Sequence, residues 1–216
     1  MIFKANYKSV IAIGGFNPTI LTPDFLRDYC SFRSDHEPLG RTTPILAEIV
    51  YGNIKFLAEL NRFQIFLDEI EGFEGIFPID TMIKYLEVLK YTPLTLFGIN
   101  FNYQLSDINE RIIRQALKNP FQLEKTFGFI PSSVLLSATK PNGDGLSLSE
   151  LTVTHNLKPE IKNSVRISFS NKILTVNENY ELSGLDIDRD RIGAIIENYP
   201  VFLENNSTLI KLIGGF

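Results

Sequence analysis

The chain has 216 residues, of which 44% are hydrophobic, and 21 basic and 25 acidic side chains give it a formal net charge of −4. This is the composition of an ordinary globular protein that can bury a core, and it excludes disorder on a large scale. Because the charges are spread along the chain, the sequence lacks the basic surface that binding to duplex DNA or RNA requires, and we expect no nucleic-acid partner.

The sequence also favours a particular compartment. Residues 10–13 form an apolar run that is too short for a secretory signal core. No segment approaches the roughly 20 apolar residues of a membrane span. Cys30 is the single cysteine, so an internal disulfide is impossible, which fits a reducing compartment. We therefore expect a cytoplasmic protein that does not contact a membrane.

The first predicted elements are a strand and a short helix. Residues 9–16 are apolar and β-branched, which is typical of a strand. Thr22 is suited to the N-cap of a helix and Pro23 to its first position. Residues 34–43 are polar and contain Pro and Gly, which indicates a long connection.

A run of strands and a helix follows. Residues 44–51, 54–60 and 63–67 are predicted as strands, with turns at Gly52-Asn53 and Asn61-Arg62. The two last strands form a tight hairpin in this interpretation.

Apolar residues at helical intervals predict a helix over residues 79–89, which Pro93 ends. Residues 94–103 predict a strand, with Phe97, Ile99 and Phe101 on one face.

In the second part of the chain, residues 107–118 predict a helix and residues 141–145 a turn. The predicted strands there are residues 133–139, 146–154, 164–170 and 173–176.

The final segment has the most regular helical pattern. It predicts one helix kinked at Pro200, or two abutting helices. A strand over residues 208–213 is the competing interpretation.

Two parts of the chain repeat a strand–strand–helix pattern. We expect one α+β domain over residues 1–216, in which an antiparallel sheet or sheets carry helices on one face and two similar halves, about 44–105 and 132–216, are related by a pseudo-twofold arrangement. Chance similarity is the alternative, since hairpins and helices that begin at Asp are common. The matching segments are Leu60-Asn61-Arg62-Phe63 with Ser170-Asn171-Lys172-Ile173, Ile79-Asp80 with Ile187-Asp188, and Tyr91 with Tyr199.

Two further stretches carry a family resemblance. They are Pro93-Leu94-Thr95-Leu96-Phe97-Gly98-Ile99-Asn100-Phe101-Asn102 and Leu185-Asp186-Ile187-Asp188, followed by the helical pattern over residues 191–216. In these features the chain resembles a sporadically distributed family of uncharacterised bacterial proteins. The resemblance would cover most of the chain, and it implies no reaction.

Several motifs resemble chemical sites. Residues 186–190, with Glu197 at the twelfth position, imitate the spacing of a calcium loop, but Arg191 occupies the position where that loop needs glycine. We favour carboxylates at a helix start. Ser137 and Lys140 have a Ser-x-x-Lys spacing, but they close a strand instead of opening a helix.

Nucleophile and carboxylate candidates are also present. Cys30 with His36 or His155 would make a thiolate–imidazole pair, although a lone Cys on an apolar helix face usually packs. Asp68 with Glu69 and Glu71 would suit a hydrolase, although a solvated strand end is the simpler interpretation.

Gly14-Gly15 and Gly214-Gly215 lack the spacing of a dinucleotide loop. We therefore name no catalytic residue and expect neither a cofactor nor a metal.

Two functions remain open. The first is a non-enzymatic interaction protein that self-associates, because the strands are rich in aromatic residues and no catalytic constellation is visible. The second is a small-molecule-binding protein or enzyme with a cleft between the two halves, lined by Asn100, Asn102 and Tyr103. The sequence leans away from an enzyme.

Overall fold

The computed structural model describes most of the chain and divides it into two compact units. The N-terminal unit consists of Tyr7–Asn100 and Glu181–Ile196, and the C-terminal unit of Met1–Asn6, Phe101–Tyr180 and Glu197–Phe216. The described residues are 2–68, 79–106, 133–139, 147–158, 161–170, 173–185 and 187–202.

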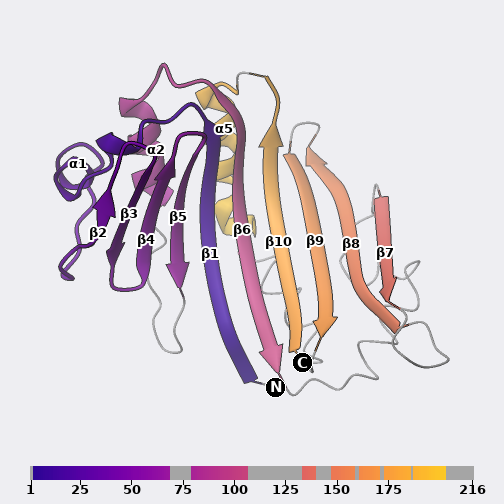
Figure 1. The fold of residues 1–216 in the computed structure, drawn as a ribbon. Helices are drawn as coiled ribbons and strands as arrows, with labels where there is room; N and C mark the ends of the chain where they lie inside the picture. The colour runs from indigo at the N-terminus through magenta and orange to yellow at the C-terminus, as the bar shows by residue number, and fades with distance from the viewer. Residues whose placement is uncertain are drawn as a thin grey trace. The chain divides into compact units, whose positions relative to one another are not determined.

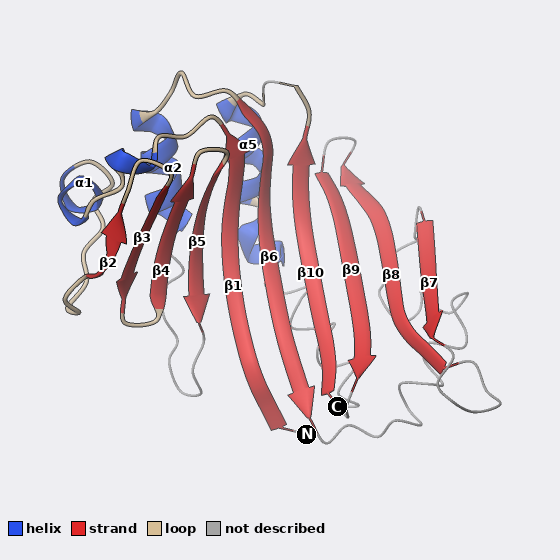
Figure 2. Ribbon diagram, viewed as in Figure 1, coloured by secondary structure: helices blue, strands red, loops and turns tan. Residues whose placement is uncertain are grey.

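The fold is α+β, with antiparallel strands and few helices, as the sequence predicts (Figures 1 and 2). Hydrogen-bonded neighbours follow the order β2-β3-β4-β5-β1-β6-β10-β9-β8-β7. The strands are β1 (Ile2–Gly14), β2 (Leu39–Thr42), β3 (Leu46–Tyr51), β4 (Ile54–Glu59), β5 (Arg62–Asp68), β6 (Leu94–Ser106), β7 (Ser133–Thr139), β8 (Ser147–Lys158), β9 (Ile161–Ser170) and β10 (Ile173–Ser183). The helical segments are η1 (Pro18–Ile20), α1 (Pro23–Asp28), α2 (Ile79–Val88) and α5 (Arg189–Glu197).

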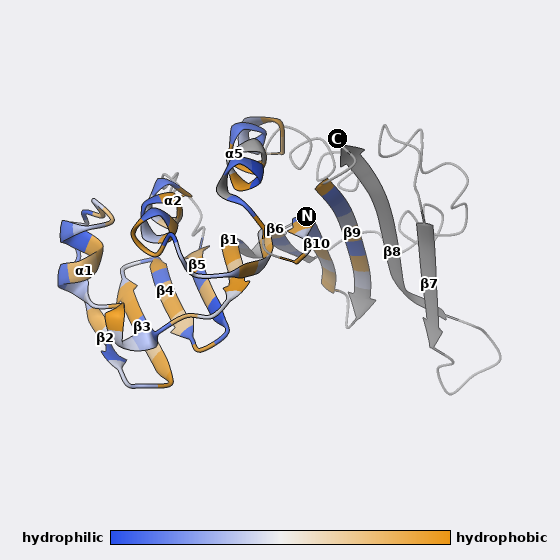
Figure 3. Cartoon of the chain, turned by 90° about the horizontal axis from the view of Figure 1, so that it is seen from above, coloured by the Kyte–Doolittle hydropathy of each residue, from blue (hydrophilic) through white to orange (hydrophobic). Residues whose placement is uncertain are grey.

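In the N-terminal unit, α1 and α2 cover one face of the sheet, which we call the inner face (Figure 3). Side chains alternate between the faces of a strand, and cross-strand partners share a face. Ala12, Phe63, Ala58 and Ala47 are successive partners across β1, β5, β4 and β3, and all four are fully buried on the inner face.

Aromatic rings fill the space between this inner face and the helices. Tyr85 of α2 stacks on Phe63 of β5, with ring centroids 3.7 Å apart, and it also meets Phe16 and Phe25. Phe32 packs edge-on against Phe56 of β4, with ring centroids 4.8 Å apart. The many Phe and Tyr residues therefore supply the large buried surfaces that a core without Trp needs.

Gly14 ends β1 at a point where two backbones meet. A Cβ atom at this position would overlap the carbonyl oxygen of Pro93 and lie 2.9 Å from the side chain of Leu94. Gly15 next to it has open space around it, and its N–H donates to the Pro93 carbonyl. Glycine at position 14 thus permits the start of β6 to approach the end of β1 closely.

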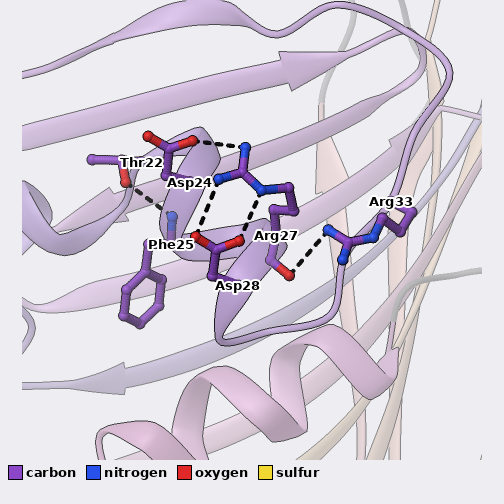
Figure 4. Close-up of polar contacts among 6 residues, drawn as sticks. All are labelled: Thr22, Asp24, Phe25, Arg27, Asp28 and Arg33. Carbon is purple, nitrogen blue, oxygen red and sulfur yellow. Dashed lines mark hydrogen bonds and ion pairs between the residues drawn. The ribbon is translucent and has the colours of Figure 1, made fainter.

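The start of α1 follows from local sequence signals. Thr22 is the N-cap, and its hydroxyl accepts a hydrogen bond from the N–H of Phe25 at 3.1 Å. Arg27 lies between Asp24 and Asp28 and contacts both carboxylates at 2.8 Å, as Figure 4 shows. The hydrogen bonds from Arg27 lower the pKa of the exposed Asp28 carboxyl. The N-cap that the sequence predicts is confirmed.

The C-terminal unit has a core of its own. β9 pairs with β8 and β8 with β7, all antiparallel. β10 buries every second residue from Leu174 to Leu182. The helical residues after α5 carry Phe202, which stacks on Tyr180 of β10 with centroids 3.8 Å apart. Phe101 meets the same Tyr180 ring edge-on at 6.1 Å.

Several sequence predictions agree with these bounds. The strand over residues 133–139 and the break before Pro200 are confirmed, because α5 ends at Glu197 and helical backbone resumes after Asn198. The predicted hairpin exists, but its turn is Leu60-Asn61, because Arg62 already pairs with Glu59.

Several predicted bounds were wrong. The strand expected over residues 9–16 is β1, which already begins at Ile2, and the strand expected over residues 164–170 is β9, which begins at Ile161. Residues 34–43 were expected to be a connection, but they contain β2, because pairing with β3 gives this polar, exposed segment its strand geometry. β10 was expected to end at Val176, but it continues to Ser183.

The predictions over residues 107–118, 141–145 and 208–213 lie outside the described residues. Among the described helices, none is both long enough and apolar enough to cross a membrane.

Candidate functional site

The side of the N-terminal sheet turned away from α1 and α2 is the first candidate site, and we call it the outer face. Its residues are the cross-strand partners that alternate with those of the inner face. An antiparallel sheet with one solvated face normally shows polar residues there. The outer face instead carries six half-buried large apolar side chains, namely Ile11, Ile13, Leu46, Val50, Leu57 and Phe66.

The polar groups of the outer face are largely engaged with one another. The Gln64 amide donates to the Ser9 hydroxyl at 3.1 Å, and both side chains are buried. Arg62 forms a 2.8 Å ion pair with Glu59. The Nε atom of Arg62 is buried and has no hydrogen-bond partner among the described residues. The face therefore leaves one buried donor unsatisfied.

Charges of both signs lie on the outer face. The Lys55 ammonium sits over the Phe66 ring, 4.6 Å from its centroid. Cross-strand positions set Arg41 opposite Glu48 and Arg62 opposite Glu59. The charged members are three cations and three anions, namely Arg41, Lys55, Arg62, Glu48, Glu59 and Asp68.

The second candidate site is a cluster of buried polar side chains in the C-terminal unit, which we call the polar cluster: Asn163, Glu178 and Tyr180. These side chains are 1%, 3% and 1% exposed, respectively. The Tyr180 hydroxyl donates to Glu178 Oε1 at 2.6 Å, and the Asn163 amide donates to the same oxygen at 3.2 Å. Buried charged or amide groups are rare in cores unless they are hydrogen-bonded.

The sequence pattern alone did not lead to the polar cluster. The run Asn177-Glu178-Asn179 resembles a loop, so β10 was expected to end before it. The available signal was the alternation of Leu174, Val176, Tyr180 and Leu182, in which Glu178 occupies an inward position.

Asn163 gives the same signal on β9. It occupies the inward phase of Ile161, Val165 and Ile167. A polar residue in the apolar phase of two strands joined by a short turn marks such a cluster.

The proposed nucleophile pair is not assembled by the described residues. Cys30 is buried, and burial raises the pKa of its thiol to about 12, which keeps it protonated and unreactive. The ring of His36 lies against the Gly52 turn, and no hydrogen bond joins it to Cys30. His155 belongs to β8, but its side chain lies outside the described part of the chain.

Asp188, just before α5, acts at a helix start, as favoured from the sequence. The Asp188 carboxylate accepts a hydrogen bond from the N–H of Arg191 at 2.8 Å. Asp186 lies outside the described residues. No group of three or more His, Cys, Asp or Glu side chains that could hold a metal occurs in the part of the chain that the structure describes.

Within the described chain, the other candidate carboxylate and amides lie on different strands, β5 and β6. Asp68 is exposed at the end of β5, where its backbone pairs with Asn53, and Glu69 and Glu71 lie outside the described residues. On β6, Asn100 and Asn102 are half-buried and share one face, and the buried Tyr103 lies on the other.

Ser137 lies in mid-strand on β7, and Lys140 lies outside the described residues. A strand gives Ser137 no helix start, as the sequence context indicated.

Comparisons with known proteins add little to this geometry. No family model and no curated protein matches the chain. One solved structure that the chain matches is the di-domain ARO/CYC StfQ from the steffimycin biosynthetic pathway. The two chains share 9% identity, the match covers 98% of this chain and 97% of the other, and the TM-score is 0.33. At that TM-score the likeness supports no conclusion about fold or function.

Proposed function

We propose that this chain is a non-enzymatic interaction protein that self-associates, with two copies meeting through the outer face of the N-terminal unit. One observation carries the proposal: the outward phase of β1, β3, β4 and β5 holds six half-buried large apolar side chains among its polar ones, where a solvated sheet face is normally polar. Apolar side chains left at the surface among polar ones are typical of contact sites between proteins.

The charge pattern favours a second copy as the partner. In a twofold contact each patch meets itself, so a patch of one sign would repel its copy. The outer face carries three cations and three anions, and turning one copy over the other brings opposite signs within reach. An acceptor of the second copy would also satisfy the Arg62 Nε atom.

The size of the outer face sets the expected strength of the dimer. Five strands about 4.8 Å apart, with about six residues each at about 3.3 Å, span roughly 20 by 20 Å. Two such faces in contact bury about 800 Å² in projection, which is less than the 1,200–2,000 Å² or so of stable complexes. We therefore expect a weak dimer with a dissociation constant at or above the micromolar range.

A charge-insertion variant tests this contact. Val50 lies opposite Lys55 across the strand pair, so Val50→Glu gains a cross-strand ion pair in the monomer. In the dimer the new carboxylate at position 50 would lose its contact with water, so we expect the dissociation constant of Val50→Glu to be at least about tenfold higher than that of the wild type. Tyr91→Glu is the matched control, because Tyr91 is 88% exposed and lies outside this face. Equal self-association of both variants and the wild type would refute the proposal.

We also propose that the chain is an internal duplication with pseudo-twofold symmetry. The support is the order of the strands and of the helix after them: one strand, a connection, four strands and a helix, given once by β1 to α2, where η1 and α1 lie in the connection, and again by β6 to α5. Strand neighbours follow the same rule, β2-β3-β4-β5-β1 and β7-β8-β9-β10-β6. From this order of elements, the two proposed copies are about residues 2–88 and 94–202, whereas the sequence pattern alone placed the halves at about 44–105 and 132–216. An experimental structure whose two copies fail to superpose would contradict it.

Two further parts of the proposal rest on the sequence. Membership of the sporadically distributed bacterial family stays a proposal, supported by the segments that begin at Pro93 and Leu185. Cytoplasmic location is proposed because the only cysteine is buried as a free thiol.

A further inference from the structure

The cross-strand register arranges the outer face of the N-terminal unit into three rows that run across the strands. Side chains two residues apart on a strand lie about 6.6 Å apart, and neighbouring strands lie about 4.8 Å apart. The middle row consists of Ile11, Gln64, Leu57, Glu48 and Arg41, one end row of Ile13, Arg62, Glu59 and Leu46, and the other end row of Ser9, Phe66, Lys55, Val50 and Leu39.

A second copy can lie on this face in two symmetric ways. In aligned packing, two sheets keep their strand directions within about 30° of each other, so the twofold axis between them runs either along the strands or across them. The contact is largest when the axis passes through the centre of the face. This centre is Leu57, which lies in the middle row and on β4, the middle strand of β2-β3-β4-β5-β1.

An axis along the strands brings like charges together. It sets each residue of β4 against its own counterpart, so Lys55 meets Lys55 of the second copy and Glu59 meets Glu59. It also sets Ile11 of β1 against Arg41 of β2. Like charges in contact cost free energy, which disfavours this arrangement.

An axis across the strands, along the middle row, exchanges the two end rows. Lys55 then meets Glu59 of the second copy, and Glu59 meets Lys55. The same exchange sets Val50 against Leu46, so that an apolar side chain covers an apolar one. Opposite charges and apolar groups are therefore matched at both ends of the contact.

Residues on this axis meet their own counterparts. Ile11 and Leu57 form apolar contacts in this way. Glu48 and Arg41 also meet themselves, but they are cross-strand partners, so each carboxylate has a guanidinium beside it. The middle row is therefore compatible with this axis as well.

We propose that the two copies meet with their strands antiparallel, about a twofold axis that crosses the strands along the middle row, and that Lys55 of each copy pairs with Glu59 of the other. This inference rests on the proposed self-association and adds the orientation of the second copy and the side chains in contact.

Charge reversal tests the pairing. Lys55→Glu and Glu59→Lys each set like charges against one another at both ends of the contact, so each should raise the dissociation constant at least about tenfold in sedimentation velocity of the full chain. The double variant Lys55→Glu/Glu59→Lys restores opposite charges and should return to within about threefold of the wild type. The two positions are four residues apart on β4, about 13 Å, so an ion pair within one chain does not explain the rescue.

Lys55→Glu/Glu87→Lys is the matched control. It has the same net charge as the rescued double variant, but it reverses an exposed residue of α2 in place of Glu59. Its dissociation constant should stay as high as that of Lys55→Glu alone.

Cross-linking gives a readout that needs no charge variant. Ile11→Cys lies on the proposed axis and should form a covalent dimer with a short-armed bismaleimide, whereas Ile13→Cys, also half-buried on β1, lies off the axis and should not. The native Cys30 is buried and does not compete. A wild type that stays monomeric would refute self-association itself. A wild type that dimerises would refute this orientation alone if the double variant stays dissociated, or if Ile13→Cys cross-links as readily as Ile11→Cys.

Discussion

Removing the hydroxyl of Tyr85 should stabilise the protein. This side chain is fully buried in α2, and its hydroxyl has no hydrogen-bond partner among the described residues. Its ring stacks on Phe63 at 3.7 Å and contacts Phe16 and Phe25, all of which Phe in its place would keep. Tyr85→Phe therefore deletes an unpaired polar atom while it preserves the packing.

The expected gain follows from the cost of burying an unsatisfied polar group, which is about 1–3 kcal/mol. We expect Tyr85→Phe to raise the free energy of unfolding by about 1 kcal/mol, which corresponds to about 2–4 °C in melting temperature for a chain of this size. Tyr85→Ala is the contrasting variant. Losing the stacked ring should cost about 3–5 kcal/mol.

Alkaline pH gives the same substitution a second readout. Burial, and to a smaller extent the nearby Cys30, raises the pKa of Tyr85 well above its ordinary value of 10.0. At pH values below this ordinary pKa, the hydroxyl keeps its proton in both the folded and the unfolded chain, so stability does not depend on this group. Above it the unfolded chain loses the proton first, and stability falls as pH rises. The advantage of Tyr85→Phe should therefore grow above about pH 10.

Urea denaturation followed by circular dichroism measures both effects. The midpoint of Tyr85→Phe should lie above that of the wild type, with an unchanged slope. A loss of stability greater than about 0.5 kcal/mol in Tyr85→Phe would refute the reasoning, because it would mean that the hydroxyl has a stabilising partner.

Three further substitutions or reactions have definite expected outcomes. Gly14→Ala forces a Cβ atom onto the Pro93 carbonyl and should destabilise by about 1–3 kcal/mol in urea denaturation, whereas Gly15→Ala should change stability by less than about 0.5 kcal/mol. Thr22→Ala removes the N-cap of α1 and should cost about 1 kcal/mol by the same assay, most of which Thr22→Ser restores. The Cys30 thiol, buried and with its pKa raised to about 12, should react with a disulfide reagent at pH 8 only after urea unfolds the chain; prompt labelling of the native protein would contradict this.

Local signals account for what the sequence predicted well. The N-cap at Thr22 and the first-turn Pro23 act within a few residues of themselves, so their meaning does not depend on the rest of the fold. The same holds for the hairpin, although its turn lies one residue earlier than predicted, and for the break before Pro200. The wrong bounds lie where tertiary pairing decides. Gly40 and its neighbours form β2 only because β3 pairs with them.

The candidate sites were harder to predict because their signals depend on which face of a strand is covered. In the run from Ser9 to Ile13 both phases are apolar, so alternation does not reveal which side packs under the helices. Glu178 made β10 resemble a loop, and its inward position became visible only with Tyr180 two residues later on the same face. Hydrogen bonding with Asn163 is a contact between strands, which no local pattern encodes.

Sedimentation velocity of the full chain tests self-association most directly. Across low micromolar to several hundred micromolar concentrations, we expect the wild type and Tyr91→Glu to shift together from monomer toward dimer, and Val50→Glu to remain monomeric. A wild type that stays monomeric over this whole range would contradict self-association through the outer face. So would a Val50→Glu variant that is folded and dimerises like the wild type.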